Sequence, residues 1–557
     1  MPPSSDTLRI ALAQLNLHVG DIRANLEAIR RARAEAARRG AELVVTPEFS
    51  IGGYPPEDLV RRPVFVADCE AAIAELARDT EDGGPGLIVG GPWRDGERLY
   101  NAACVLDGGR VLARRAKHEL PNYGVFDDKR VFDAGPAPGP VAFRGFRLGV
   151  MVCEDFWFPD VSETLGETGA EILISINGSP FEDGKQDRRI ALGVSRVVET
   201  GLAFVFCAQV CGQDELVFDG ASFVLNPDRS LAVQMPAFSE AVTLTEWRRD
   251  GERLVCTPQP LPPEPDRLEL IYRCMMLGLS DYVRKNRFPG VILGLSGGID
   301  SALSLAVAVD ALGHEKVRAF MLPSPYTSRH SLEDAAECAR LLGVRCDTVP
   351  ITAAMEAFER ALAPVFNGCQ ADATEENIQS RSRGVILMAL SNKLGDMLLT
   401  TGNKSEMSVG YATLYGDMCG GYSVLKDVYK TTVFALCRWR NRRRPAGALG
   451  PDGPVIPERV IAKPPSAELK HDQTDQDTLP PYDTLDAILE GLVEGEKSVD
   501  ALAAEGFDRA TVLRVSRMLD RAEYKRRQAP PGVKLTARAF GRDRRYPITN
   551  PYAGQGS

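Results

Sequence analysis

The segment 291–312 constrains the fold of this 557-residue chain more than any other. Residues 291–295 form a short, wholly apolar run of the kind found in buried parallel strands. From Ser301 onward, apolar residues recur at helical spacing, and the pattern stops at Gly313. A buried strand, a tight turn and a helix in direct succession are the repeating unit of a doubly wound parallel sheet. The sequence therefore predicts that fold for this part of the chain.

The turn between this strand and helix has the composition of a phosphate-binding loop. Its residues are Ser296, Gly297, Gly298, Ile299, Asp300 and Ser301. Two glycines let the backbone approach a ligand closely, and the free N–H groups at the start of the helix favour an anion. The loop lacks the lysine of the common nucleoside triphosphate loop. Because Asp300 fits an anion site when it holds Mg²⁺ that bridges phosphates, we expect a phosphate and Mg²⁺ site here.

A chain of this length needs more than one hydrophobic core, and one stretch marks the boundary. Residues 256–266 hold five prolines, which exclude a helix or a central strand and predict a stiff linker. We therefore expect one domain at 1–255 and another at 267–557.

Both domains alternate strand-like and helical patterns, which indicates the α/β class. In the first we expect strands at 8–15, 43–46, 86–90, 101–106, 147–152, 171–176 and 203–209, and helices at 25–39 and 187–200. In the second we expect strands at 291–295, 316–322, 344–350 and 396–401, and helices at 301–312, 331–342, 353–363 and 375–394.

Charge and composition argue against several classes of partner. The net charge of −10 argues against nucleic acid, because phosphate contacts need clustered Lys and Arg. No apolar run approaches the ~20 residues of a membrane span, and the N-terminus lacks the pattern of a signal peptide. The 12 Cys residues are scattered and lie mostly in apolar runs, as in a reduced cytoplasmic protein. We expect Cys207 and Cys211 to be core residues and not zinc ligands.

A strongly basic segment lies near residue 440. Arginines at 438, 440 and 442–444 precede a stretch rich in Pro and Gly, so we expect 440–455 to be a flexible surface loop. We interpret its five arginines as a solvated face and not as a nucleic-acid site.

Three short strings in the first domain together fit the chemistry of amide hydrolysis. Glu48 follows one apolar strand pattern, Cys153 follows another, and Lys117 lies between them in the chain. A cysteine needs a base to become a thiolate, and Glu48 can be that base. Attack on an amide creates an oxyanion, which Lys117 and the backbone N–H of Glu154 can stabilise. None of the five His lies in a motif typical of the partner of a cysteine nucleophile, so we favour Glu48.

These strings resemble known families. Pro-Glu-Phe at 47–49, Lys-x-x-Leu-Pro-Asn-Tyr at 117–123 and Cys-Glu-Asp-Phe-Trp at 153–157 resemble the carbon–nitrogen hydrolase (nitrilase) superfamily, and the turn at 296–301 resembles the N-type ATP pyrophosphatases. Fused in this order, they resemble the glutamine-dependent NAD⁺ synthetase family, as do strings at 376–384, 400–406, 415–422 and 524–548. The resemblance implies an α/β fold in two parts. These are a nitrilase-like α-β-β-α sandwich and a doubly wound parallel-sheet domain of the adenine nucleotide alpha hydrolase type.

The resemblance also implies roles for individual residues. It implies a glutaminase triad of Glu48, Lys117 and Cys153. It implies a glutamine pocket lined by Tyr123, Glu154 and Ser179, with either Lys185 or Arg188 binding the α-carboxylate. It implies ATP contacts at Ser296, Gly297, Gly298, Ile299, Asp300, Ser301 and Thr401. It implies contacts with deamido-NAD⁺ or the ATP phosphates at Arg383, Glu406, Asp417, Lys430 and Ser466, and Mg²⁺ ligands at Asp300 and Glu406.

The reaction that the resemblance implies has two steps. The carboxylate of nicotinic acid adenine dinucleotide (deamido-NAD⁺) is adenylated by ATP, the co-substrate, with Mg²⁺ as cofactor. Ammonia released from glutamine then displaces AMP and gives NAD⁺. The family also forms homo-oligomers, so we expect a homo-oligomer with small-molecule substrates, no nucleic acid, no membrane and a cytoplasmic location. A sealed ammonia path is likewise implied by the family and not by residue spacing.

Three alternatives compete with this interpretation. A pyrophosphatase-loop ATPase that modifies tRNA predicts a basic surface and often a Cys-x-x-Cys pair, and the chain has neither. A scaffold with an inactive amidase predicts the loss of Glu48, Lys117 or Cys153, and all three are present. An amide-forming ligase that acts on another carboxylate is opposed only by the strings that resemble the dinucleotide site.

Overall fold

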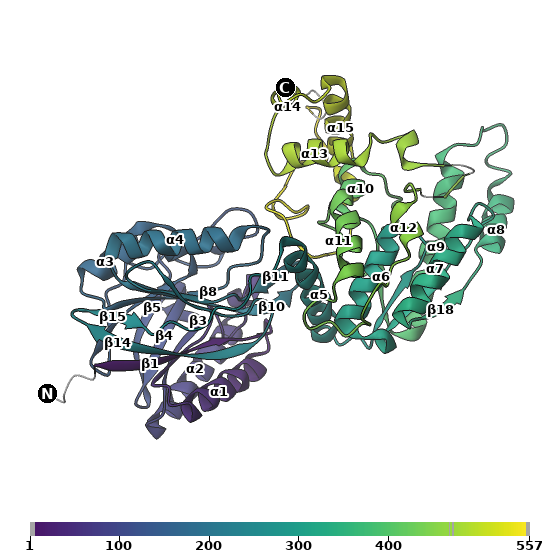
Figure 1. Cartoon of the computed structure of the whole chain (residues 1–557). Coiled ribbons are helices and arrows are strands. Elements are labelled where there is room, and N and C mark those ends of the chain that lie inside the picture. Colours follow the sequence, from purple (N-terminus) through teal and green to yellow (C-terminus); the bar gives the residue numbers. More distant parts are fainter. Residues whose placement is uncertain (1–5, 467, 471–472, 553–557) are drawn as a thin grey trace. The chain divides into compact units, whose positions relative to one another are not determined.

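The computed structural model describes residues 6–466, 468–470 and 473–552, which divide into two compact units (Figure 1). One unit comprises Met1–Gln213 and Val217–Glu264, and the other comprises Asp214–Leu216 and Pro265–Ser557. Within the described residues, no helix combines the length and the apolar character needed to cross a bilayer.

Two large sheets make up most of the first unit. The seven-stranded sheet contains β1 (Thr7–Gln14), β2 (Leu43–Val45), β3 (Gly86–Asp95), β4 (Arg98–Asp107), β5 (Arg110–Ala116), β14 (Ala241–Asp250) and β15 (Arg253–Cys256), in the order β15-β14-β1-β2-β3-β4-β5. The six-stranded sheet contains β6 (Val141–Phe143), β7 (Phe146–Val152), β8 (Ile172–Asn177), β9 (Ala203–Ala208), β12 (Phe223–Leu225) and β13 (Leu231–Gln234), in the order β13-β12-β9-β8-β7-β6. A two-stranded sheet pairs β10 (Val210–Gln213) with β11 (Leu216–Asp219).

The two large sheets stack face to face around the core of this unit. Alternate residues of each strand point inward, so Leu8 and Ile10 of β1 share one fully buried cluster with Val150 and Val152 of β7. Helices α1 (Ile22–Arg38) and α2 (Pro63–Asp79) cover one outer face, and α3 (Pro159–Glu167) and α4 (Lys185–Thr200) cover the other (Figure 1). The expected α-β-β-α sandwich is therefore confirmed.

The second unit is built on a sheet whose five strands are all parallel. They are β16 (Val291–Gly294), β17 (Val317–Met321), β18 (Arg345–Thr348), β19 (Met397–Thr400) and β20 (Tyr422–Ser423), in the order β18-β17-β16-β19-β20. The strand order reverses between β16 and β19, and ligands of such sheets bind beyond the carboxyl ends of the strands at this point. The expected doubly wound parallel sheet is confirmed, and the turn 296–301 lies where it was expected.

Helices pack around this sheet and extend beyond it. Those that alternate with the strands are α5 (Arg267–Lys285), α6 (Ile299–Leu312), α7 (Arg329–Leu342), α8 (Thr352–Leu362), α9 (Ala373–Leu394), α10 (Lys404–Val409), α11 (Lys430–Arg442) and α12 (Glu458–Ala462). A C-terminal group contains α13 (Tyr482–Val493), α14 (Val499–Ala504), α15 (Arg509–Arg521) and α16 (Glu523–Arg526). This group has a core of its own around Leu485, Ile488 and Val512, each fully buried.

The elements predicted from sequence are all present, and most ends lie within three residues of the prediction. The exception is β3, which runs to Asp95 and not to residue 90. Its last residues include Gly91 and Pro92, which are unfavourable in strands. They are nevertheless held in the strand because β3 pairs antiparallel with β4 as far as Asp95.

The prediction of a solvated arginine face near residue 440 is wrong for one residue. Arg440 lies in α11 and is fully buried, whereas Arg438 and the three arginines at 442–444 are exposed. The guanidinium of Arg440 bonds both carboxylate oxygens of Asp310, at 2.6 and 3.0 Å, and the carbonyls of Pro451 and Gly453. A count of charged residues cannot reveal this, because the partner lies 130 positions away in the sequence.

The cysteines agree with the expectation of free thiols. All twelve are described and none forms a disulfide. Cys207 and Cys211 are both buried in the first unit, which confirms that they are core residues.

Candidate active sites

The first site is centred on the carboxylate of Glu48, which is fully buried three residues after the end of β2. Its Oε1 accepts hydrogen bonds from Lys117 Nζ at 2.9 Å and from Asn101 Nδ2 at 2.7 Å. Its Oε2 accepts one from the backbone N–H of Gly178 at 2.8 Å. Three donors from segments distant from Glu48 in sequence therefore hold this carboxylate in one orientation.

Lys117 lies between two carboxylates. Its Nζ donates to Asp128 Oδ2 at 2.7 Å as well as to Glu48, and its side chain is fully buried. Burial alone would lower the pKa of Lys117, but the charges of Asp128 and Glu48 outweigh this effect and hold the pKa well above its usual value. Lys117 is therefore a permanent positive charge beside the cysteine.

Cys153 follows β7 directly and has a φ of 46°, a left-handed conformation that few residues other than glycine adopt. Such a turn presents a side chain at the end of a strand. Burial raises the pKa of the Cys153 thiol well above its usual value, the charge of Glu48 raises it further, and Lys117 opposes both. The resting thiol is therefore protonated at neutral pH, and a base must take its proton before it can attack.

Asp155 joins the cysteine turn to the lysine segment. Its Oδ2 accepts a hydrogen bond from the backbone N–H of Val152 at 2.9 Å, and its Oδ1 accepts from those of His118 and Glu119 at 2.9 and 2.8 Å. The neighbours of Cys153 and Lys117 in the chain are thus bonded to one buried carboxyl. Asp155 fixes the two reactive side chains relative to each other.

Three of the residues expected to bind glutamine contact the segment 154–157, which follows Cys153 directly. Tyr123 donates its hydroxyl hydrogen bond to Glu154 Oε1 at 2.8 Å. The Arg188 guanidinium lies 4.8 Å from the ring centroid of Trp157, and Lys185 Nζ lies 5.9 Å from the same centroid. Both cations expected as alternatives thus lie beside one aromatic ring, and the choice between them stays open.

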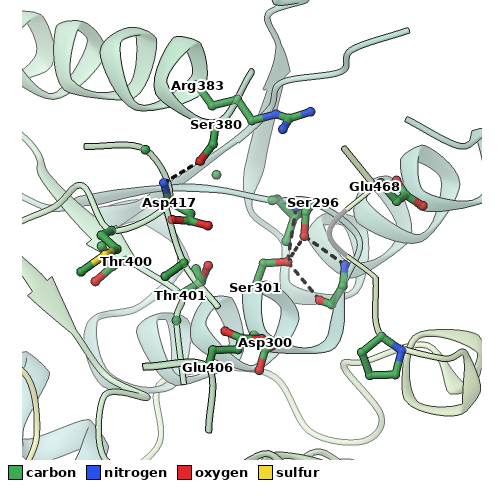
Figure 2. Close-up of a pocket in the computed structure, with 18 of the residues that line it drawn as sticks. Ser296, Asp300, Ser301, Ser380, Arg383, Thr400, Thr401, Glu406, Asp417 and Glu468 are labelled. Carbon is green, nitrogen blue, oxygen red and sulfur yellow. Dashed lines mark hydrogen bonds between the residues drawn. The ribbon is translucent and has the colours of Figure 1, made fainter. Parts of the chain in front are cut away.

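The second site is a cavity of about 330 Å³ in the other unit (Figure 2). All the residues expected to contact ATP or the dinucleotide line it except Gly297: Ser296, Gly298, Ile299, Asp300, Ser301, Thr401, Arg383, Glu406, Asp417, Lys430 and Ser466. Residues that lie up to 170 positions apart in the sequence thus meet in one pocket at the carboxyl ends of β16 and β19.

The turn 296–301 is held by its own hydroxyl groups. Ser296 Oγ and Ser301 Oγ lie 3.0 Å apart, and Ser296 Oγ accepts a bond from the N–H of Gly298 at 3.2 Å (Figure 2). Gly297 turns the chain with a φ of +77°, and a Cβ there would lie 2.1 Å from the carbonyl oxygen of Ser331. Only glycine fits this position. The free N–H groups at the start of α6 then face the pocket, as a phosphate site requires.

Two carboxylates meet next to this turn. Asp300 accepts bonds from Lys430 Nζ and, at 2.9 Å, from Asn403 Nδ2, while Glu406 accepts from Lys430 Nζ at 3.1 Å. Burial alone would lower the pKa of Lys430, but Asp300 and then Glu406 raise it above its usual value. Burial also raises the pKa of Glu406 to about 7, against the lowering effect of Lys430.

The donor set of this pair fits Mg²⁺. Magnesium is usually held by one or two carboxylates, with phosphate oxygens and water as the other ligands, and not by an all-protein cage. No group of three His, Cys, Asp or Glu side chains suited to hold a metal occurs in the described part of the chain. Asp300 in the turn 296–301 and Glu406 next to it therefore offer the carboxylates that Mg²⁺ would need beside a bound nucleotide.

The remaining pocket residues have defined partners. Asp417 Oδ1 accepts from the N–H of Thr413 at 2.7 Å, and the Asp417 N–H donates to Ser380 Oγ at 2.9 Å (Figure 2). The Asp417 side chain opens onto the cavity, but protein encloses it on its other sides, and this burial raises its pKa to about 6. Arg383 Nε donates to the carbonyl of Leu322 at 3.1 Å. The hydroxyl of Ser466 bonds the carbonyl of Gln473.

Comparison with known proteins covers both sites. Residues 9–254 match the carbon-nitrogen hydrolase family, and residues 271–529 match the NAD synthase family. The glutamine-dependent NAD(+) synthetase of Rhodobacter capsulatus is 54% identical over 551 residues, which are 99% of this chain and 100% of that protein. This chain belongs to the glutamine-dependent NAD⁺ synthetase family. The synthetase of Thermotoga maritima is 41% identical over 578 residues, with 98% and 99% covered.

Solved structures of this family extend the comparison. The glutamine-dependent NAD⁺ synthetase of Acinetobacter baumannii, in complex with adenosine diphosphate, has a TM-score of 0.79 at 42% identity, with 98% of this chain and 99% of that chain covered. The synthetase of Cytophaga hutchinsonii has a TM-score of 0.82 at 23% identity, with 99% of each chain covered, which shows the fold alone. Membership over both units confirms the expected family and decides against the tRNA-modifying alternative.

The structure adds residues that the motifs of this synthetase did not reveal. Asn101 donates to Glu48 and Asp128 accepts from Lys117, but Asn101 lies within β4, where the sequence predicted only a strand, and Asp128 lies outside every string singled out from sequence. Asp155 belongs to a string singled out from sequence, yet its role depends on contacts with residues 118 and 119. Asn403 likewise lies in a string singled out from sequence, at 400–406, and Asn-x-x-Glu at 403–406 is a capping box at the start of α10.

Proposed function

We propose that this synthetase makes NAD⁺ from nicotinic acid adenine dinucleotide, ATP and glutamine, with AMP, pyrophosphate and glutamate as the other products. The observation that carries the proposal is that one chain of this family holds two chemically complete sites. One is the Glu48–Lys117–Cys153 cluster and the other is the pocket built on the turn 296–301. We assign glutamine hydrolysis to residues 1–255 and NAD⁺ synthesis to 267–557, with 256–266 as the linker.

In the first site Glu48 takes the thiol proton as Cys153 attacks the side-chain amide carbon of glutamine. Lys117 and the backbone N–H of Glu154 stabilise the oxyanion that forms. The C–N bond then breaks, the ammonia leaves with a proton from Glu48, and Cys153 retains a γ-glutamyl thioester. Glu48 next removes a proton from water, which hydrolyses the thioester and releases glutamate. The hydrogen bonds to both oxygens of Glu48 aim it for these transfers.

In the second site the substrate carboxylate attacks the α-phosphorus of ATP, and pyrophosphate leaves. The hydroxyls of Ser296 and Ser301 and the N–H groups that start α6 bind the phosphates, with Thr401, Arg383 and Ser466 on the surrounding walls. Asp300 and Glu406 would hold Mg²⁺, which would supply positive charge to the departing pyrophosphate. Lys430 orients these two carboxylates, and Asp417 accepts a proton as ammonia displaces AMP.

Activation by ATP and delivery of ammonia answer two chemical needs. A carboxylate cannot take up ammonia at neutral pH without a leaving group, and AMP is that leaving group. Ammonia in water is mostly ammonium at pH 7, which is not nucleophilic. We therefore include in the proposal that ammonia passes from the Cys153 site to the adenylate without mixing with the bulk solution.

The proposal includes a homo-oligomer in the cytoplasm. Helices α8 and α9 expose apolar side chains that a monomer leaves in water, namely Phe358 (45%), Val385 (63%) and Met388 (37%). The free thiols fit a reducing compartment. Sedimentation of the wild type and of Val385→Asp tests the first part. We expect the variant to dissociate, and a monomeric wild type would contradict the proposal.

The test of the function is a product balance. The purified protein is incubated with ATP, Mg²⁺, nicotinic acid adenine dinucleotide and glutamine, and all products are quantified. We expect NAD⁺, AMP, pyrophosphate and glutamate in equal amounts. Glutamate without NAD⁺ would leave the glutaminase assignment standing and overturn the assignment of the acceptor carboxylate.

A further inference from the structure

A buried arginine next to the first site has a complete set of partners and no assigned role. Arg189 lies on α4 and is 1% exposed. Its Nη1 bonds both oxygens of Asp219 at 2.9 Å and Gln186 Oε1 at 3.1 Å. Its Nη2 donates to the carbonyls of Ser179 and Pro180 at 2.8 and 2.9 Å, and its Nε donates to Ser179 Oγ at 3.1 Å. A guanidinium has five N–H groups, and each of them finds an acceptor here.

Three of these bonds end on one short segment, which also carries part of the reactive site. Gly178 precedes Ser179 and gives its N–H to Glu48 Oε2. Gly178 is closely packed, because a Cβ there would lie 2.5 Å from a ring carbon of Tyr54 and 2.9 Å from Glu48 Oε2. A shift of a few tenths of an ångström in this segment would therefore change how the base is held.

The direction of one hydrogen bond is fixed by chemistry. Guanidinium has no acceptor, so Ser179 Oγ must accept the bond from Arg189 Nε. The hydroxyl hydrogen of Ser179 is then left to donate elsewhere. A donor at this point recognises an oxygen of the ligand, either an amide carbonyl or a carboxylate, and does not recognise an ammonium group.

Asp219 on β11 keeps the buried guanidinium neutralised. Its side chain is 6% exposed and bonds Nη1 with both oxygens. Without it, the charge of Arg189 would lie uncompensated in the interior, and the fork of donors would lose its orientation. Lysine keeps the charge but cannot reach Ser179 Oγ and two carbonyls at once, so Arg189→Lys removes the fork and preserves the ion pair.

We propose that Arg189 and Asp219 form a positioning pair that holds segment 177–181, directs the Ser179 hydroxyl as a donor to the oxygen of glutamine, and keeps the Gly178 N–H on Glu48. The inference rests on the proposed function, because it takes glutamine as the ligand of this site. Neither residue touches the reacting atoms. Both act through Ser179 and Gly178.

The test is a double-mutant cycle on glutamine hydrolysis. Arg189→Lys, Ser179→Ala and the double variant are compared with the wild type for kcat and KM of glutamate release. We expect Arg189→Lys to raise the KM for glutamine about tenfold, the size of one lost hydrogen bond to a charged group, with a smaller change in kcat. In the Ser179→Ala background the same substitution should raise the KM less than about threefold.

Two controls separate positioning from general damage. Arg196→Lys changes another buried arginine of α4, one whose guanidinium bonds the carbonyl of Phe156 and the carboxylate of Glu199, and should leave the KM for glutamine unchanged. Synthesis driven by ammonium chloride should be unaffected in every variant, because it bypasses the first site. Should Arg189→Lys fail to fold, Asp219→Asn keeps the acceptor shape and gives the same cycle, with the same sign and a smaller effect.

The outcomes are distinct. Equal effects of Arg189→Lys in both backgrounds, or an unchanged KM, would overturn the positioning role while wild-type glutaminase activity keeps the proposed function. A wild type that hydrolyses no glutamine would overturn the proposed function, and the positioning role with it.

Discussion

At the scale of single residues, the first site is a balance of charges set around a thiol. Lys117 Nζ donates to the carboxylates of Glu48 and Asp128, and burial holds the pKa of the Cys153 thiol well above its usual value, so in the proposed mechanism Glu48 must accept its proton. The sequence predicted Glu48 and Cys153 because each follows a strand pattern within a recognisable string, and it predicted Lys117 because that residue begins the string at 117–123. It could not predict Asp128, because the approach of that residue to Lys117 depends on the path of an irregular segment.

Removal of the thiol should separate the two activities. We expect Cys153→Ala to lower glutamine-driven NAD⁺ synthesis at least about 1,000-fold, because no thioester can form. Synthesis driven by ammonium chloride should stay within about twofold of the wild type, since the second unit is unchanged. Steady-state rates with each nitrogen source measure both effects. Loss of both activities would contradict the assignment of two separate sites.

The carboxyl of Asp417 should make the rate of ammonia-driven synthesis fall at acid pH, which gives the pH–rate profile an acid limb. Its pKa is raised to about 6, so the carboxylate form prevails above pH 6 and is lost as the pH falls through that value. If the carboxylate accepts the proton of the attacking ammonia, the rate at constant free NH₃ should fall about tenfold per pH unit below pH 6.

Rates measured from pH 5 to 8, with total ammonium adjusted to hold free NH₃ constant, test this limb. Asp417→Asn should be slow and should lack the limb near pH 6. An Asp417→Asn profile with the same limb as the wild type would show that another group titrates.

At the scale of elements, two helices behind the second site are joined at two matching points. Asp300 and Asp310 on α6 pair with Lys430 and Arg440 on α11, and both steps span ten residues, 310 − 300 and 440 − 430. Ten residues of helix are about 15 Å long, so the two ion pairs connect α6 and α11 at equal spacing, and the two helices run in the same direction. The Asp300–Lys430 pair lies at the pocket, and the Asp310–Arg440 pair, the inner pair, is fully buried in the interior.

Loss of the inner pair, Asp310–Arg440, should destabilise the second unit. We expect Arg440→Met to lower the free energy of unfolding by about 3–5 kcal/mol, because it leaves the carboxylate of Asp310 buried without its cation. The hydroxyl of Tyr272, 2.7 Å from Asp310 Oδ2, compensates only in part. Urea unfolding followed by circular dichroism gives the value for the transition of this unit.

The matched control is an exposed arginine of the same segment. Arg443 pairs with Asp266, but its side chain is 64% exposed, so Arg443→Met should cost less than about 1 kcal/mol. Similar losses in the two variants would mean that the inner pair contributes no more than a surface pair.

The sequence predicted helices and strands where the apolar pattern extends over enough residues to distinguish helical from strand spacing. Strands β16 and β19 are short apolar runs, and α6 and α7 have clear helical spacing, so these four elements were found within a few residues. Short elements escaped notice: β6 spans three residues and α16 four, too few to show a period. The pairing of α6 with α11 escaped for another reason, because sequence spacing within one helix says nothing about its neighbour.

At the scale of the whole molecule, one chain carries two chemistries that are useful only together. The first site releases ammonia, and the second activates a carboxylate to accept it. The proline-rich stretch at 256–266 and the two groups of motifs predicted this division, because each group is complete within its own part of the chain. How ammonia travels could not be predicted, since a path depends on surfaces that no local pattern encodes.

The central claim is that the amide nitrogen of NAD⁺ comes from glutamine through Cys153 and not from ammonium in solution. The most direct measurement supplies amide-¹⁵N glutamine together with a tenfold excess of unlabelled ammonium chloride and determines the isotope content of NAD⁺ by mass spectrometry. We predict mostly ¹⁵N product from the wild type and only ¹⁴N product from Cys153→Ala. Wild-type NAD⁺ labelled only in proportion to the mixed pool would contradict the account.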